Sequence, residues 1–118
     1  MTTLSQLKCV ACRGGESKLT DVEVAELQKE LHGWELKEID GILRLEKVFR
    51  RKNFIEALAL ANKVGVIAEE EDHHPLMIVE WGRVTIQWWT HVVKGLHKND
   101  FIMAAKTDQL EAGYSKPV

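Results

Sequence analysis

The chain has 118 residues, the length of one domain, and its 45% apolar and 29% charged residues are typical of a soluble globular protein. Its net charge of −2 gives no basic face, which argues against direct nucleic-acid binding and electrostatic attachment to an anionic membrane. No apolar run is long enough to cross a membrane and no secretory signal is recognisable, so we expect a cytoplasmic protein with no membrane partner.

Residues 1–18 lack clear hydrophobic periodicity, and we expect a flexible N-terminal arm ahead of a single domain spanning residues 19–118. The arm contains Cys9 and Cys12 in a Cys-x-x-Cys spacing. Two thiolates can supply half of a zinc site or a redox pair. Because no second such pair follows and no strand precedes the motif, the favoured interpretation is two reduced cysteines.

The first helix is expected to begin after Thr20, where Glu23 completes a capping box. Val24 and Leu27 lie on its apolar side, at the spacing of a half-buried helix. Gly33 suits the position just beyond a helix end, so the helix is expected to stop there.

Residues 34–38 and 43–49 are predicted to form two antiparallel strands joined by a turn at Asp40-Gly41, a typical hairpin dipeptide. The second strand alternates, with leucines and Phe49 on one face and mostly polar residues on the other. This pattern indicates a sheet covered on one side.

Asn53 is expected to cap a second helix over residues 54–70, whose apolar residues recur at steps of three and four. Its C-terminal end carries four consecutive acidic residues, Glu69, Glu70, Glu71 and Asp72. Negative charge is unfavourable at this end of the helix dipole. Such local conflicts are expected at functional sites.

Residues 76–81 and 83–91 are predicted to form a second hairpin around Gly82, and residues 98–112 a third helix. The resulting order is α-β-β-α-β-β-α. It predicts an α+β fold with a four-stranded antiparallel sheet and three helices packed on one face.

Two adjacent histidines, His73 and His74, follow the acidic run, and Pro75 biases His74 toward an extended backbone. The helix end and the carboxylates favour protonated imidazole, which suits a general acid; alternatively both are loop histidines that stabilise the helix end. If the second hairpin pairs its strands, counting from Gly82 brings His91 close to His74. Three imidazoles in one cleft suit acid–base catalysis on a small molecule, because imidazole exchanges protons near neutral pH.

A zinc site is the competing interpretation, since three imidazoles can ligate zinc. The carboxylates of the acidic run could then hydrogen-bond to the ligating imidazoles. Adjacent histidines can share one ion only in an irregular loop, and the His-Glu-x-x-His helical spacing is absent. Acid–base chemistry without a metal is therefore favoured, and no metal site is assigned.

Two roles are possible for the tryptophans of the second hairpin. Trp81, Trp88 and Trp89 could hold a flat heterocycle or could fill a core or an interface. Because Trp88 and Trp89 are consecutive, they are expected to face opposite sides of the sheet. Asp100, in the first turn of the third helix, is expected to be a capping or dipole partner.

The spacing of these residues resembles the signature of the pterin-4a-carbinolamine dehydratase family. The residues that carry the resemblance are Glu69, His73-His74-Pro75, Trp81, His91 and Asp100, within a stretch from Leu19 to about Leu110. The resemblance implies the α+β fold and assembly into homodimers or homotetramers. It implies dehydration of 4a-hydroxytetrahydropterin to quinonoid dihydropterin, which recycles the pterin of aromatic amino-acid hydroxylases.

The family pattern also implies roles for individual residues. His73, His74 and His91 correspond to the catalytic histidines, with His74 as our choice for the acid. Substrate binding or tuning of the imidazoles is implied for Glu69, Asp72, Pro75, Trp81 and Thr90. The pterin is itself the substrate, so no further cofactor is expected. Two alternatives stay open, a non-enzymatic dimerisation or regulatory module and a role in molybdopterin metabolism.

Overall fold

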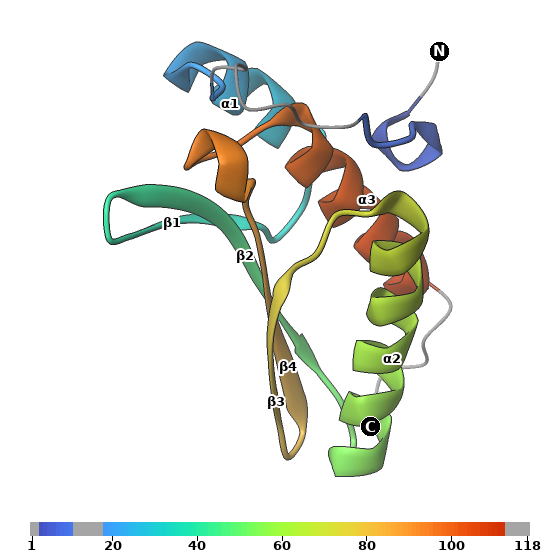
Figure 1. The fold of residues 1–118 in the computed structure, drawn as a ribbon. Coiled ribbons are helices and arrows are strands. Elements are labelled where there is room, and N and C mark those ends of the chain that lie inside the picture. The colour runs from blue at the N-terminus through green and yellow to red at the C-terminus, as the bar shows by residue number, and fades with distance from the viewer. Residues whose placement is uncertain (1–2, 11–17, 113–118) are drawn as a thin grey trace.

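The computed structural model describes residues 3–10 and 18–112 and shows a four-stranded sheet with helices against one face (Figure 1). The predicted α+β class and the order α-β-β-α-β-β-α are confirmed. The elements are η1 (Leu4–Gln6), α1 (Asp21–Gln28), β1 (Glu35–Ile39), β2 (Ile42–Arg50), α2 (Phe54–Glu71), β3 (Leu76–Glu80), β4 (Arg83–Trp88), η2 (His91–Val93) and α3 (Lys98–Ala112).

All strand pairs are antiparallel, in the order β1-β2-β4-β3. The register places Leu45 of β2 opposite Trp88 of β4, and Met77 of β3 opposite Ile86 of β4. Alternate residues of a strand share a face, so these side chains lie on the same side of the sheet. That side is the one covered by α2 and α3 (Figure 1).

The core lies between the sheet and the helices. Leu45, Ile86 and Trp88 from the strands and Phe101 and Met103 from α3 are 0% exposed. Burial of each such side chain contributes about 1.5–3 kcal/mol relative to exposure. Because β4 and α3 are fixed by this packing, the residues at the end of β4 and at the start of α3 have well-defined positions.

The capping box at the start of α1 is confirmed. Thr20 Oγ1 accepts a hydrogen bond from the Glu23 N–H, and the Glu23 carboxylate accepts one from the Thr20 N–H. The bond from the Thr20 backbone lowers the pKa of Glu23, so this contribution to stability is present above the ordinary pKa and is lost as the pH falls through the lowered value.

The predicted end of this helix at Gly33 is wrong, because α1 ends at Gln28. The Gln28 side chain donates a hydrogen bond to the Trp34 carbonyl at 3.2 Å. The chain turns early so that Leu31 and Trp34, which are 9% and 4% exposed, reach the core. Burial of these side chains outweighs the local preference for a longer helix.

The turn between β1 and β2 has the left-handed backbone expected of an Asp-Gly hairpin, with φ of 54° at Asp40 and 78° at Gly41. A Cβ at Gly41 would meet nothing within 4 Å, so Gly41→Ala introduces backbone strain alone. We expect this variant to lower the free energy of unfolding by about 1 kcal/mol, and Gly41→Asn by less. Urea denaturation measures the difference, and an alanine variant as stable as the parent would contradict the assigned strain.

The remaining elements differ little from the predicted ones. Asn53 caps α2 by accepting a hydrogen bond from the Glu56 N–H at 2.9 Å. β4 ends at Trp88 rather than His91, because the chain leaves the sheet and enters η2 after an isolated bridge between Thr90 and Gly95. Among the helices of residues 3–10 and 18–112, none combines the length and apolar character needed to cross a membrane.

The N-terminal arm is packed rather than loose in its described part, residues 3–10. Leu4 is 5% exposed in the core, and Lys106 donates a hydrogen bond to the Ser5 carbonyl at 2.9 Å. The few apolar residues of this segment therefore find partners that local periodicity does not reveal, and the flexibility of the arm stays a prediction. Cys12 lies outside the described residues, so the reduced state of Cys9 and Cys12 stays a prediction.

Candidate active site

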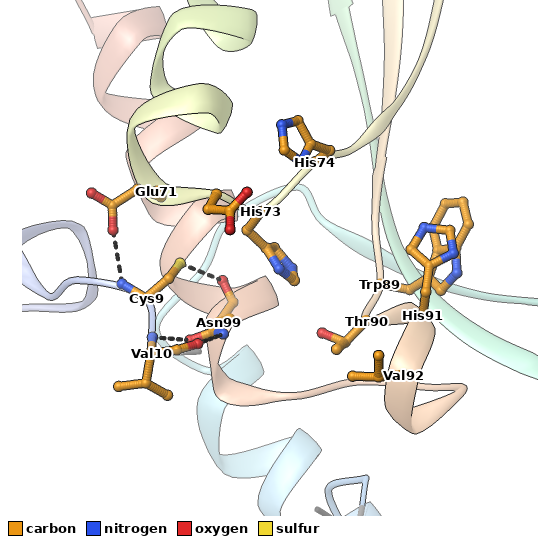
Figure 2. Close-up of a pocket in the computed structure, with 11 residues that line it drawn as sticks. Cys9, Val10, Glu71, His73, His74, Trp89, Thr90, His91, Val92 and Asn99 are labelled. Atoms are coloured by element: carbon orange, nitrogen blue, oxygen red, sulfur yellow. Dashed lines mark hydrogen bonds between the residues drawn. The ribbon is translucent and has the colours of Figure 1, made fainter. Parts of the chain in front are cut away.

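A pocket of about 460 Å³ lies where the end of α2, the end of β4 and the start of α3 meet. Figure 2 shows the side chains that surround it. The residues that line it are Cys9, Val10, Glu71, Asp72, His73, His74, Trp89, Thr90, His91, Val92 and Asn99. The three histidines singled out in the sequence therefore share one pocket, as the hairpin count predicts.

The backbone at the end of α2 sends the two adjacent histidines to different surroundings. Asp72 adopts a left-handed conformation, with φ of 51° and ψ of 43°, and the His73 N–H donates to the Ala68 carbonyl at 3.1 Å. This closure is the usual way in which a helix satisfies its last carbonyls. Beyond it the His73 side chain is mostly buried, whereas the His74 side chain is half exposed.

The His73 ring is held by two contacts. Its Nε2 lies 2.7 Å from Oδ1 of Asp100, whose side chain is 0% exposed. One face of the ring stacks on Trp88, with ring centroids 5.9 Å apart and an angle of 10° between the planes. The position and orientation of this imidazole are therefore set by the protein.

Asp100 joins the start of α3 to the end of β4. Its Oδ2 accepts hydrogen bonds from Thr90 Oγ1 at 2.8 Å and from the His97 N–H at 2.9 Å. The His97 ring completes the cap, because its Nδ1 accepts from the Asn99 N–H at 3.0 Å. The capping role expected for Asp100 is confirmed, and its second oxygen adds the contact with His73.

This arrangement selects a tautomer of His73. A carboxylate only accepts hydrogen bonds, so the proton of a neutral His73 ring lies on Nε2, facing Asp100. The opposite nitrogen, Nδ1, is then an acceptor. His73 can consequently take a proton from a bound molecule while Asp100 holds its other side.

His74 is paired with Glu69, whose Oε1 lies 2.6 Å from its Nε2. Both side chains are exposed, at 53% and 80%. An exposed pair of this kind contributes about 0–1 kcal/mol, so it orients the ring without locking it. His74 can therefore move to meet a ligand.

His91 lies against Trp89, with ring centroids 4.7 Å apart. Arg44 of β2 lies over the same indole at 3.9 Å, and it donates a hydrogen bond to Gln87 at 3.1 Å. A cation over an indole ring is attracted to its electron-rich face. These contacts place Trp89 on the side of the sheet opposite to the buried Trp88, as predicted, and provide a surface against which His91 rests.

The structure brings most of the predicted site residues together. Asp72, His73, His74, Thr90 and His91 line the pocket. Glu69 and Pro75 lie beside it and line a neighbouring hollow that also contacts His74.

Two expectations need correction. Trp81 does not line the pocket, because it occupies the turn between β3 and β4, at the far end of the hairpin, with 73% of its surface exposed. Asp72 lines the pocket, but in the described part of the chain its carboxylate makes no hydrogen bond to His73 or His74. Its clear structural role is the left-handed residue that ends α2.

Sequence reasoning missed the wall of the pocket formed by Cys9, Val10, Glu71 and Asn99. No local pattern indicated it, because it depends on contacts between residues about 60 to 90 positions apart along the chain. Within residues 3–10 and 18–112, no group of three or more His, Cys, Asp or Glu side chains is placed to hold a metal ion.

Comparison with known proteins identifies a family for this chain and solved structures that share its fold. Residues 17–110 match the family model described as Pterin 4 alpha carbinolamine dehydratase. A crystal structure of a transcriptional coactivator/pterin dehydratase from Brucella melitensis is 30% identical, with a TM-score of 0.71 over 80% of this chain and 98% of that one. A pterin dehydratase-like protein identified as a RuBisCO assembly factor in the alpha-carboxysome shares the fold, with 22% identity and a TM-score of 0.57 over 71% of this chain and 94% of that one.

Proposed function

Because this chain belongs to the pterin 4 alpha carbinolamine dehydratase family, we propose that it is a hydro-lyase that converts 4a-hydroxytetrahydropterin to quinonoid dihydropterin and water. The observation that carries the proposal is the pocket shared by His73, His74 and His91, with His73 fixed by the buried Asp100. This combination offers both an acid and a base in a space of about 460 Å³, large enough for a bicyclic ring.

The reaction requires two proton movements. The bond between C4a and the hydroxyl oxygen breaks as that oxygen receives a proton and leaves as water. The lone pair of N5 forms the new double bond to C4a, and N5 then loses its proton. A positioned acid at the hydroxyl and a positioned base near N5 each contribute to the rate.

We assign His74 as the acid, because its half-exposed ring can take up a proton from solvent while Nε2 stays paired with Glu69, and Nδ1–H can then donate that proton. We assign His73 as the base at N5, because Asp100 holds the proton of the neutral ring on Nε2 and leaves Nδ1 to accept. His91, supported by Trp89, positions the pterin against these two groups.

The proposed reaction needs no further cofactor, because the pterin is the substrate and the electrons stay within it. In this function the protein acts in the cytoplasm and returns the oxidised pterin of aromatic amino-acid hydroxylases to a form that a reductase can use.

We also propose that the protein is a homodimer or homotetramer. The outer side of α2 exposes Ile55, Leu58 and Val66, at 71%, 37% and 57%, although the inner side of the same helix packs on the core. These residues recur along one side of the helix, and a second copy of α2 would cover them. Equilibrium sedimentation that gave only a monomer at micromolar concentration would contradict this assembly.

The test of the function is a direct dehydration assay. A 4a-hydroxytetrahydropterin generated in situ by a hydroxylase loses water spontaneously, and the purified protein is expected to accelerate formation of the quinonoid product, followed by its ultraviolet absorbance. Acceleration should scale with protein concentration and saturate with substrate. A folded protein that leaves the spontaneous rate unchanged would overturn the proposal.

A further inference from the structure

The N-terminal segment of residues 3–10 lies before the region matched by the family model, which begins at residue 17. It is nevertheless anchored to the domain at its start. Leu4 is buried in the core, and the Ser5 carbonyl accepts a hydrogen bond from Lys106 of α3. These contacts fix the path that the segment takes toward the pocket.

The end of the segment is held by two residues of the pocket wall. The Cys9 N–H donates to Glu71 Oε1 at 2.8 Å. Asn99 makes two hydrogen bonds to Val10, with its Oδ1 accepting from the N–H at 3.0 Å and its Nδ2 donating to the carbonyl at 2.7 Å. Asn99 is only 2% exposed, so the segment is tied to a buried side chain, although Val10 itself is 62% exposed.

These two anchors, Glu71 and Asn99, lie next to the proposed base His73 and to Asp100, which orients it. Glu71 ends α2 two residues before His73, and Asn99 immediately precedes Asp100 in α3. The segment therefore bridges the two helices from which His73 and Asp100 are presented.

The segment also lines the pocket that holds the histidines. Figure 2 shows Cys9 and Asn99 on one side of His73, with Trp89 and His91 on the other. Cys9 and Val10 both line the pocket. A pterin bound in this pocket would therefore meet Cys9 and Val10 wherever its ring or its side chain extends past His73.

We propose that Cys9 and Val10 form a substrate-contacting wall, so that the N-terminal segment is part of the substrate site. The inference rests on the proposed function. Neither residue is placed in a proton-transfer step. Contacts of this kind stabilise the ground state and the transition state alike, so their loss changes KM more than kcat.

The Cys9 thiol reports directly on occupancy of this wall. In a Cys12→Ser variant, alkylation of Cys9 by iodoacetamide is followed by mass spectrometry with and without 7,8-dihydrobiopterin, a stable reduced pterin. At ten times its Kd the ligand leaves about one-eleventh of the sites empty, so alkylation should slow by about tenfold. The matched control moves the thiol by one residue, in a Lys8→Cys/Cys9→Ala/Cys12→Ser variant. Lys8 is exposed and does not line the pocket, so its alkylation rate should not change.

A kinetic variant completes the test. Cys9→Phe narrows the pocket and is expected to raise KM at least tenfold with a much smaller change in kcat. Suppose that the parent accelerates dehydration, but the pterin leaves Cys9 alkylation unchanged and Cys9→Phe keeps the KM of the parent. The proposal that Cys9 and Val10 contact the substrate is then refuted, while the dehydratase function is supported. If the pterin protects Cys9 while the parent shows no acceleration, the wall stands and the dehydratase assignment fails.

Discussion

His73→Ala is expected to lower kcat for pterin dehydration by about 10²- to 10⁴-fold, the usual contribution of a positioned acid–base group. The variant removes the imidazole whose Nε2 contacts Asp100 and whose Nδ1 is proposed to accept the N5 proton. Stopped-flow measurement of quinonoid product formation under saturating substrate reports this loss. A change confined to KM would contradict the assignment of His73 as a base.

The same variant is expected to lower the free energy of unfolding by about 1–3 kcal/mol, because one oxygen of the buried Asp100 loses its partner. Two measurements separate this structural cost from catalysis. Added imidazole should restore part of kcat in His73→Gly, and it should leave kcat of the parent unchanged. His32→Ala serves as the control, since His32 lies exposed between α1 and β1 and, among residues 3–10 and 18–112, its hydrogen bond is made by the backbone carbonyl, which accepts from Lys47.

The parts of the fold that could be predicted from the sequence are those set by short-range chemistry. Thr20 and Glu23 specify a capping box, Asp40-Gly41 specifies a tight turn, and Asn53 specifies a helix start, and each does so within four residues. The end of α1 is different. It is decided by burial of Trp34 against strands and a helix that come later in the chain, which no local rule contains.

The candidate site also contains residues whose positions follow from the local sequence and residues whose positions depend on tertiary contacts. The approach of His91 to His74 follows from one hairpin and a count of residues, and the structure confirms it. The same count places Trp81 at the turn, at the opposite end of the hairpin, so this error was avoidable. The wall formed by the N-terminal segment was not predictable, because it depends on the docking of Val10 on Asn99 across 89 positions.

Asp100 has two roles, one that the local sequence predicts and one that only the tertiary structure shows. Its position in the first turn of α3 predicts a cap, and Oδ2 does accept the His97 N–H. The contact between Oδ1 and His73 could not be read from that pattern, since the two residues are 27 positions apart. A carboxylate has two oxygens, so one cap residue can also orient a catalytic ring.

Asp100→Asn tests this double role with almost no change in size. The asparagine oxygen would remain with its two donors, Thr90 Oγ1 and the His97 N–H, because turning the amide would place donors against donors. The amide nitrogen would then face His73 and donate to its Nε2. The ring proton would move to Nδ1, the nitrogen that the proposed base needs as an acceptor.

We therefore expect Asp100→Asn to fold and to bind pterin with little change in KM, while kcat falls by about 10²- to 10⁴-fold. Nitrogen NMR of the His73 ring should show the change of tautomer directly. The matched control is Asp108→Asn, because Asp108 also lies in α3 but pairs with Lys47 and Trp34 away from the pocket, and its loss should affect stability rather than kcat. If Asp100→Asn keeps both its tautomer and its kcat, Asp100 is a helix cap alone, and His73 needs no partner to act as the base.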